Sequence, residues 1–322
     1  MGPRALTLVL ALALLLAAGC GADGPQRTLT VTTMVPTAAP APAPLPGTGK
    51  PAITIGDKNF TEQFILGELY YLALKAQGYT VSLDSNIGPT EVTLQGLANG
   101  TISMYPEYLS TWNQAVAGDA GYYPNELAAL RAARSYGLAH GYALLNPTPF
   151  SDTNALAVTF NYGVANDLTS IPDLNTLPYP LTIGGPPQFA SDPNGLPAIE
   201  QTYGIAPASF KPLELGGQYQ ALDQGTVQVA EVNTTDGQLI TGNYTLLKDP
   251  RKVFGWGNVV PVVPLRVIAA EGPQFAATIN RVTALLTLTA IRQLNTAVDI
   301  DNQDPATVAT RFLREHALIP PA

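Results

Sequence analysis

The chain has 322 residues, which is too long for one minimal hydrophobic core and fits two domains comfortably. Charged residues make up 12% and hydrophobic residues 46%, so the composition is that of a globular protein and excludes intrinsic disorder. The formal net charge of -8 argues against a nucleic-acid-binding function, which requires a basic surface.

The N-terminus predicts an exported protein. Arg4 precedes the apolar run 5–18, which is too short for a comfortable membrane span and suits the core of a signal peptide. The run ends in Leu16-Ala-Ala-Gly-Cys20, which resembles the bacterial lipobox. We therefore expect residues 1–19 to be a signal peptide and Cys20 to carry a lipid at the outer face of the cytoplasmic membrane. An ordinary signal peptide with a chance cysteine is the alternative.

Cys20 is the one cysteine of the sequence, so the mature chain can hold no internal disulfide. Residues 21–50 are rich in Thr, Ala, Pro and Gly and contain few large apolar residues. Such a segment cannot bury enough surface to fold, and its prolines keep it extended. We expect residues 20–50 to form a lipid anchor and a linker.

The first folded elements alternate between strand and helix. Residues 52–55 alternate in polarity and predict a strand. Asn59 lies three residues before Glu62, which is the spacing of a capping box at a helix start. Gly78 would end that helix, and a second strand is expected over 79–83.

A second helix is expected between Thr90 and Gly100, followed by a strand that enters the aromatic stretch 102–112. Pro106 is expected to end this strand, because proline has no N–H for a ladder. The alternation predicts a parallel sheet, whose ligands gather at the carboxyl ends of the strands. Lys58, Asn59, Thr90 and residues 105–111 all fall at such ends.

The second half of the chain continues with both kinds of element. We expect strands at 155–160, 181–183 and 227–232, a helix within 125–142, short helices from 194 and at 219–222, a long amphipathic helix at 275–296, and a final helix at 305–316. The apolar run 259–269, with prolines at 261 and 264, is expected to cross between two lobes.

Several motifs resemble one known family. They are Gly56-Asp-Lys-Asn-Phe-Thr-Glu-Gln63, Gly88-Pro-Thr-Glu91, Tyr105-Pro-Glu-Tyr108, Phe189-Ala-Ser-Asp-Pro-Asn-Gly-Leu-Pro197 and Asn233-Thr-Thr-Asp236. The set is similar to the glycine betaine, choline and carnitine binders of bacterial ABC importers, of the OpuC and ProX type, over about residues 52–318. The resemblance implies an α/β, two-lobed periplasmic-binding-protein fold of type II, with the ligand in the cleft and two crossover strands as a hinge.

The resemblance also implies a ligand site. In this family tyrosines cage a quaternary ammonium group, and ring faces attract such a cation by about 0.5–2 kcal/mol each. Tyr108 matches a cage tyrosine, Thr111 a hydroxyl near the ligand carboxylate, and Lys58 a basic contact there. Tyr219 lies where the family often has an aromatic residue. Asn59 and Thr90 are expected at the same site because they fall at the carboxyl ends of predicted strands.

Three positions depart from the family pattern. Asn154 and Asn233 stand where tyrosines are usual, and Asp192 stands where some members have an arginine. Two lost rings would remove roughly 1–4 kcal/mol of attraction, while two amides and a carboxylate favour a more polar or cationic ligand. We therefore expect plain glycine betaine not to be the best ligand, and a histidine-derived betaine is one alternative.

The domain organisation follows from the same resemblance. We expect lobe I to comprise residues 51–150 and 260–322 and lobe II residues 151–259, with hinge crossovers near Asp152 and Pro261. The expected partners are an ABC permease with its ATPase, besides the small ligand and the membrane reached through Cys20.

Two rival functions remain. A sensor lipoprotein could use the same fold without transport. A hydrolase would have to work through Glu107, but no second carboxylate stands at a defined spacing, and Glu107 could equally be a solvated carboxylate or a cation ligand. No His, Cys, Asp and Glu residues cluster at metal-ligand spacing, so we expect neither a metal nor a cofactor.

Overall fold

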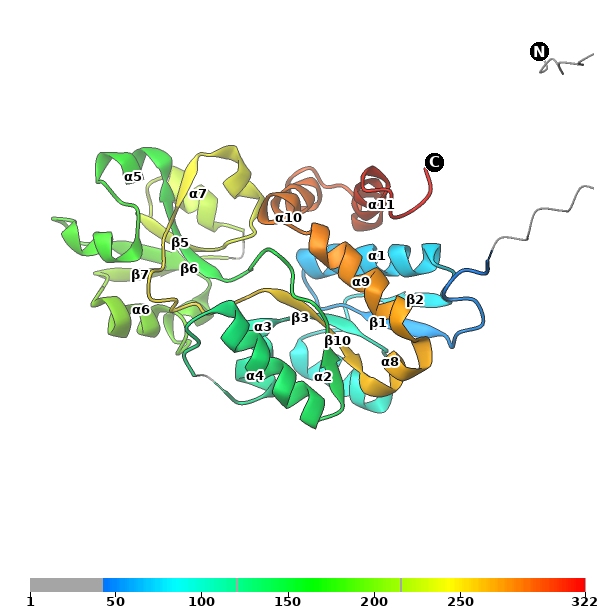
Figure 1. The fold of residues 1–322 in the computed structure, drawn as a ribbon. Helices are drawn as coiled ribbons and strands as arrows, with labels where there is room; N and C mark the ends of the chain where they lie inside the picture. The colour runs from blue at the N-terminus through cyan, green and yellow to red at the C-terminus, as the bar shows by residue number, and fades with distance from the viewer. Residues whose placement is uncertain (1–42, 120, 215, 322) are drawn as a thin grey trace, which may run out of the picture. The chain divides into compact units, whose positions relative to one another are not determined.

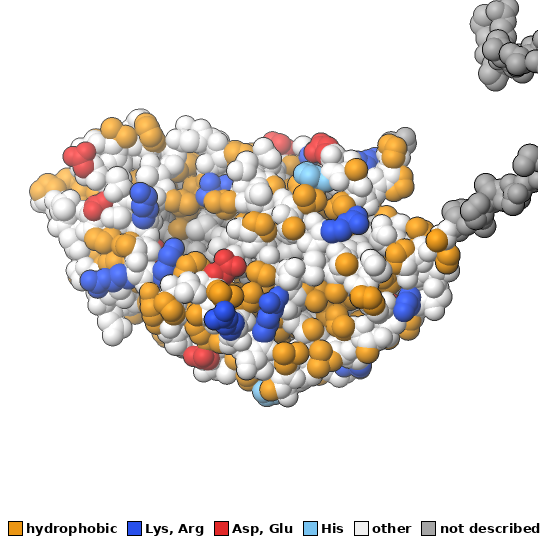
Figure 2. All heavy atoms as spheres, in the orientation of Figure 1, with side chains coloured by type: hydrophobic (Ala, Val, Ile, Leu, Met, Phe, Trp, Pro, Cys, Tyr) orange, Lys and Arg blue, Asp and Glu red, His pale blue; other side chains and the backbone are white. Residues whose placement is uncertain are grey.

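A computed structural model describes residues 43–119, 121–214 and 216–321 of the chain. The expected signal peptide at 1–19, the expected lipid anchor Cys20 and most of the expected linker therefore lie outside the described residues. Among the helices that the structure describes, none is long and apolar enough to cross a membrane. Figure 2 shows Lys and Arg side chains scattered over one face without a continuous basic patch, which agrees with the acidic composition.

The first sheet has the parallel topology expected from the sequence. Strand β1 (Ile53–Gly56) pairs with β2 (Val81–Asp84) in parallel, and helix α1 (Thr61–Ala76) connects them. Helix α2 (Thr90–Asn99) follows β2, and Gly100 after it adopts a left-handed φ of 83°. This φ favours glycine, so the predicted end of the helix is confirmed.

The third strand differs from the prediction. β3 (Tyr105–Tyr108) includes Pro106 and pairs antiparallel with β10 (Val259–Pro264), so Pro106 does not end the strand. The residue opposite Pro106 is Pro261. Neither residue has an N–H, so this pair sits where no backbone donor is required.

β10 is the central strand of a three-stranded sheet in the order β3-β10-β4, where β4 spans Tyr142–Leu144. Because both neighbours of β10 belong to the first half of the fold, β10 lies inside one lobe. The expectation that the run 259–269 crosses between lobes is therefore wrong for residues 259–264. A single parallel bridge between Ile55 and Met104 joins this sheet to β1. Figure 1 shows β10 running beside β3, although about 150 residues separate them in sequence.

Helices surround these two sheets. They are α3 (Leu109–Thr111), the π-helix η1 (Trp112–Val116), α4 (Glu126–Ala139), α8 (Leu265–Glu271), α9 (Pro273–Leu285), α10 (Leu288–Asn295), the π-helix η5 (Thr296–Ile300) and α11 (Pro305–Glu315). The single long helix expected at 275–296 is wrong. The chain leaves helical geometry at Leu286, and the Thr287 side chain then accepts a hydrogen bond from Ala290 N, which caps α10 as a new helix.

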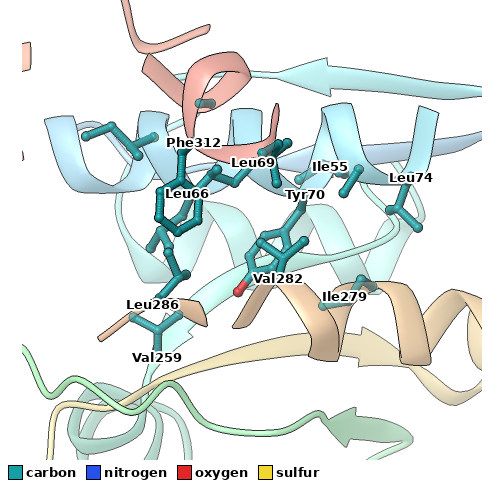
Figure 3. Packing of buried hydrophobic residues seen from close by; sticks show 14 of the residues in the cluster. Ile55, Leu66, Leu69, Tyr70, Leu74, Val259, Ile279, Val282, Leu286 and Phe312 are labelled. Carbon is teal, nitrogen blue, oxygen red and sulfur yellow. The ribbon is translucent and has the colours of Figure 1, made fainter. Parts of the chain in front are cut away.

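The main core lies between α1, α9 and α11. Figure 3 shows the α1 side chains Leu66, Leu69 and Tyr70 facing Val282 of α9 and Phe312 of α11. All five are buried. Since α1 is fixed on several sides by apolar contacts, its N-terminal turn, which carries site residues, has a rigid base.

A second group of strands forms one five-stranded sheet in the order β7-β6-β8-β5-β9. The strands are β5 (Asn154–Thr159), β6 (Thr182–Gly185), β7 (Ser209–Pro212), β8 (Val229–Asn233) and β9 (Tyr244–Leu247). Its helices are α5 (Phe160–Ala165), α6 (Leu196–Tyr203), α7 (Gln218–Asp223), and the 3-10 helices η2 (Ile171–Thr176), η3 (Pro187–Ala190) and η4 (Gly237–Thr241). The predicted strands and short helices of this half are confirmed, and β7 and β9 were not anticipated.

The end of the expected linker is part of the folded unit. Gly47 N donates to Gln77 O at 2.9 Å, and a Cβ at Gly47 would overlap the backbone of Tyr79. Lys50 Nζ also donates to Ala270 O at 3.1 Å. The compact unit therefore begins at Pro44, several residues earlier than the expected end of the linker.

Two chain segments pass between the two groups of strands and touch at Gly257. Asp152 N donates to Gly257 O at 3.0 Å, and Gly257 N donates to Ser151 Oγ at 2.9 Å. A Cβ at Gly257 would overlap the carbonyl oxygen of Asp152, and backbone cannot move aside as a flexible side chain can.

We expect Gly257→Ala to destabilise the protein by about 3 kcal/mol, because the added methyl group forces the two crossover segments apart. Gly141→Ala is the matched control. Its Cβ meets open space, so it should cost only the backbone strain of a φ of 86°, about 1 kcal/mol. Urea denaturation of both variants measures the difference. A Gly257→Ala protein as stable as wild type would contradict the close approach.

Candidate functional site

Lys58, which follows the carboxyl end of β1, and Glu107 of β3 form a buried ion pair. Lys58 Nζ donates to Glu107 Oε1, and Thr90 Oγ1 donates to Glu107 Oε2 at 2.9 Å. Tyr105 OH donates to the same Oε2 at 3.1 Å. The structure therefore brings the predicted residues Lys58 and Thr90 together, around a carboxylate that is fully buried. Because Glu107 neutralises Lys58, this lysine is not a free positive charge, and the solvated reading of Glu107 is wrong.

Tyr108 lies next to this pair, at the end of β3. The Phe60 ring stacks on it with centroids 5.9 Å apart and an interplanar angle of 29°. Lys58 Nζ lies 5.3 Å from the Tyr108 ring centroid. The Tyr108 hydroxyl donates to Glu62 Oε1 at 2.8 Å. Tyr108 is thus buried behind Phe60, which is itself 37% exposed.

Phe60 and Glu62 line an acidic cavity of about 430 Å³. The other lining residues come from the start of α1, the crossover segment at Asp152, the second group of strands with its helices, α10 and η5. We call the whole the acidic cavity, which is lined by Phe60, Thr61, Glu62, Asp152, Gly216, Gln218, Tyr219, Asn233, Thr235, Asp236, Gln238, Asn295 and Asp299. It contains two of the predicted site residues, Tyr219 and Asn233. Among the described residues that line it there is no lysine or arginine.

Three carboxyl groups meet in the acidic cavity, and burial raises the pKa of each. Desolvation raises the pKa of Glu62, and nearby Asp236 adds to this, against hydrogen bonds from Asn295, Thr235 and Tyr108. Desolvation likewise raises the pKa of Asp152 well above its ordinary value, with further increases from Glu62 and Asp236. The pKa of Asp236 is raised by burial, although Tyr219 and Asn233 N donate to it. Removal of water and mutual repulsion therefore disfavour three full negative charges here.

Tyr219 is held at the cavity wall by two contacts. Its hydroxyl donates to Asp236 Oδ2 at 2.8 Å, and its ring packs against Tyr244 edge to face with centroids 4.7 Å apart. Asn233 N donates to the same Asp236 oxygen at 3.1 Å. Asp236, in the turn after β8, thus fixes both Tyr219 and Asn233.

Two amide side chains in the cavity have unpaired acceptors. Gln218 Oε1 and Asn295 Oδ1 are buried and have no hydrogen-bond partner among the described residues. Asn295 Nδ2 donates to Glu62 Oε2 and to Thr235 O, each at 3.0 Å. Asp152 Oδ1 is also buried without a donor in the described part of the chain. Buried acceptors without donors are uncommon in proteins.

The remaining predicted residues lie apart from the acidic cavity. Asn154 is the direct cross-strand partner of Asn233, but it lines a different cavity of about 340 Å³. Asp192 accepts from Asn194 N at 2.9 Å and so stabilises its own turn. Thr111 ends α3 and is not among the described residues that line the acidic cavity.

Asn59 does not cap α1. The N-cap is Phe60, whose side chain makes no cap hydrogen bond, and Asn59 is exposed one residue earlier. The predicted capping box is therefore wrong, because Glu62 bonds to Tyr108 and Asn295 rather than to the backbone at Asn59. That change frees the Glu62 carboxylate for the cavity.

A larger cavity of about 520 Å³ lies between η1, residues 119 and 121–123, α6 and the segment 250–256. Lys252 Nζ lies 5.0 Å from the Trp256 ring there. None of the residues predicted for the ligand site lines it. We therefore take the acidic cavity, which joins aromatic rings to buried carboxyl groups, as the candidate site.

Most residues that line the site were not predicted from the sequence, among them Phe60, Glu62, Asp152 and Asp236. Phe60, Glu62 and Asp236 stand inside motifs that pointed to this region, and Asp152 was considered only as a hinge position. In the described part of the chain, no three His, Cys, Asp or Glu residues are placed to hold a metal ion.

Comparison with known proteins shows the family of this chain. The family described as "Substrate binding domain of ABC-type glycine betaine transport system" matches residues 51–315. A glycine-betaine-binding protein of Pseudomonas aeruginosa is 30% identical over 278 residues, which are 83% of this chain and 88% of the relative. The glycine betaine-binding protein YehZ of Escherichia coli is 27% identical over 82% of this chain and 90% of its own length.

Solved structures share the fold. A glycine betaine/carnitine/choline ABC transporter structure superposes with a TM-score of 0.77 at 21% identity, and covers 83% of this chain and 99% of its own. Apo YehZ from Escherichia coli superposes with a TM-score of 0.72 at 24% identity, with the same coverage of both chains. At these identities the structural likeness is evidence for the fold alone.

Proposed function

This chain belongs to the family of substrate-binding domains of ABC-type glycine betaine transport systems, and we propose that it holds its ligand in the acidic cavity. It is a solute-binding protein with the two-lobed, type II periplasmic-binding-protein fold, and not an enzyme. Members of this family bind small quaternary ammonium ligands and deliver them to an ABC permease outside the cytoplasm.

The observation that carries the proposal is the meeting of aromatic rings with buried carboxyl groups in one cavity. Phe60 and Tyr219 line it, and Tyr108 lies behind Phe60. A quaternary ammonium group has no hydrogen-bond donor on its nitrogen, so ring faces and negative charge recognise it. Glu62, Asp152 and Asp236 supply that charge.

We assign lobe I to residues 51–150 and 260–322 and lobe II to residues 151–259. Glu62 then belongs to lobe I, while Asp152, Tyr219 and Asp236 belong to lobe II. A ligand that touches both groups favours the closed form through its differential contacts. Small-angle scattering with and without ligand tests this, and the expected result is a more compact protein with ligand.

The identity of the ligand is a finer proposal. Asn233 stands in the cavity where a tyrosine is usual in the family, and the amides of Gln218 and Asn295 lie near it. This polar lining supports a ligand other than plain glycine betaine. Isothermal titration calorimetry with glycine betaine, choline, carnitine and a histidine-derived betaine tests it. Tightest binding of glycine betaine would contradict the proposed preference.

Lipid attachment through Cys20 would keep the protein at the membrane beside its permease. Mass spectrometry of the mature N-terminus from the native host tests this, with a diacylglyceryl-modified Cys20 as the expected result. A sensor lipoprotein of the same fold is the alternative function. Uptake of the labelled ligand by cells with and without the protein distinguishes the two, because a sensor leaves uptake unchanged.

A further inference from the structure

The helical rod made of α10 and η5 is fixed in the first lobe. α10 continues into η5 without a break, because Asn295 and Thr296 both keep helical φ and ψ. Ile291, Leu294 and Ala297 of this rod are buried in the same core as α1, α9 and α11. Close packing in that core holds the rod in place, so its other side chains start from a rigid base.

Two donors of the rod bind consecutive carbonyl groups of the turn after β8. Arg292 donates through Nε and Nη2 to Thr234 O at 2.9 and 2.7 Å. Asn295 Nδ2 donates to Thr235 O and to Glu62 Oε2, each at 3.0 Å. Arg292 and Asn295 are three positions apart and therefore lie on one face of the helix. One amide group thus joins the turn to a wall residue of the acidic cavity.

Backbone meets backbone at the end of the same turn. A Cβ added to Gly237 would lie 2.8 Å from both the N and the Cα atom of Thr296, which is closer than real Cβ contacts allow. Thr296 Oγ1 also lies 3.1 Å from Gly237 O, although it shares its hydrogen with Arg292 O at 2.7 Å. We call these contacts the latch, and it consists of Arg292, Asn295 and Thr296 of the rod and residues 234–237 of the turn.

The turn itself is fixed in the second lobe. Thr234 Oγ1 donates to Ser151 O at 2.7 Å, and Asp236 accepts from the Tyr219 hydroxyl at 2.8 Å. Leu239 of η4, which follows the turn, is buried in a cluster of second-lobe residues. The latch therefore joins the two lobes by non-covalent contacts, in addition to the two crossover segments of the chain.

We propose that the latch holds the two lobes together beside the acidic cavity before ligand enters, and that Arg292 is a positioning residue which sets ligand affinity through this closed form. The inference rests on the proposed function and on the lobes assigned there, and it deepens them by naming what regulates closure. Since the donors and the acceptors of the latch belong to different lobes, opening of the lobes breaks it. Each contact of the latch therefore raises the closed fraction of the protein.

A latch of this kind changes the affinity of every ligand by the same factor. When a ligand binds only the closed form, its apparent dissociation constant is the intrinsic constant divided by the closed fraction. Arg292 and Gly237 are not among the described residues that line the acidic cavity, so variants at these positions leave the ligand contacts in place. A residue that touches the ligand would instead change the affinities of different ligands by different factors.

The first variant is Arg292→Lys in the mature chain. Lysine keeps the positive charge near Asp236 but loses the planar group that donates twice to Thr234 O. Calorimetric titration with glycine betaine, choline and carnitine should show about a tenfold weakening, equal for each probe within about twofold. Arg311→Lys is the matched control, because Arg311 makes an exposed contact with Gln303 inside the first lobe. Its affinities should equal those of wild type.

The second variant, Gly237→Ala, opens the latch by a steric route, because its methyl group meets the backbone of Thr296. Gly242→Ala at the end of η4 is the matched control, since its Cβ meets open space and adds only the strain of a φ of 76°. Small-angle scattering of the ligand-free proteins should give a larger radius of gyration for Gly237→Ala and Arg292→Lys than for wild type and both controls. Ligand should then compact these two variants more than it compacts wild type.

The outcomes separate the inference from the proposed function. Ligand-free radii equal to wild type in both latch variants, unchanged affinity, or losses that differ between probes overturn the latch. Failure of all three probes to bind wild type overturns the proposed function, and the ligand-free scattering still decides the latch. Larger ligand-free radii with one common loss of affinity support both. If Gly237→Ala does not fold by circular dichroism, the conservative Arg292→Lys decides alone.

Discussion

Lys58→Met should lower the free energy of unfolding by about 3–5 kcal/mol, because it leaves the Glu107 carboxylate buried without its counter-charge. Glu107 is 0% exposed, and its remaining partners are the hydroxyls of Thr90 and Tyr105 and the backbone N–H of Tyr108. Three neutral donors do not replace an ammonium group in a low-dielectric interior. Urea denaturation at neutral pH measures the loss.

The double variant Lys58→Met/Glu107→Gln should recover much of that stability, since it buries no charge while the new amide oxygen still accepts from the two hydroxyls. Lys75→Met is the matched control near the other end of α1. Lys75 contacts the exposed Tyr71 hydroxyl, and losing such a solvent-screened surface contact should leave the stability almost unchanged. A Lys58→Met variant as stable as Lys75→Met would contradict the buried ion pair.

Tyr219→Ala should weaken binding of the preferred quaternary ammonium ligand roughly 5- to 30-fold, equivalent to about 1–2 kcal/mol. The alanine removes a ring from the cavity wall and the donor to Asp236 Oδ2. Tyr219→Phe keeps the ring and loses only the donor, so its effect should be smaller. Titration calorimetry measures both.

Tyr244→Phe is the control for this pair. Tyr244 packs on Tyr219, but its hydroxyl bonds to Asp223 and it is not among the described residues that line the acidic cavity. Phenylalanine preserves the ring contact, so affinity should stay within about twofold of wild type. Equal losses for Tyr219→Phe and Tyr219→Ala would show that the hydroxyl, not the ring face, carries the interaction.

Local chemistry explains which parts of the fold could be predicted. Gly100 adopts a left-handed φ that favours glycine, and Asn125 caps α4 through its own side chain, so both helix boundaries follow from short-range rules. Thr287 obeys the same rule, yet the expected helix at 275–296 ran through it. The apolar residues keep their helical spacing across the break between α9 and α10, so this spacing alone predicts one continuous helix.

Pairing between distant segments could not be predicted in this way. Pro106 is tolerated inside β3 because the residue opposite it is also a proline, and this register depends on a strand far along the chain. Asn59 and Glu62 have the spacing of a capping box, but the contacts that Glu62 makes with Tyr108 and Asn295 replace that local arrangement. Tertiary contacts here override local preference.

The sequence by itself determined the family, the α/β class, the acidic character and the regions near strand ends where the ligand residues lie. Only the tertiary structure decided which charges are free. It pairs Lys58 with Glu107 across 49 positions of sequence, and it brings Glu62, Asp152 and Asp236 into one cavity. The physical reason is that the charge state of a carboxyl or ammonium group depends on its burial and its neighbours, and both come from chain segments that meet only on folding.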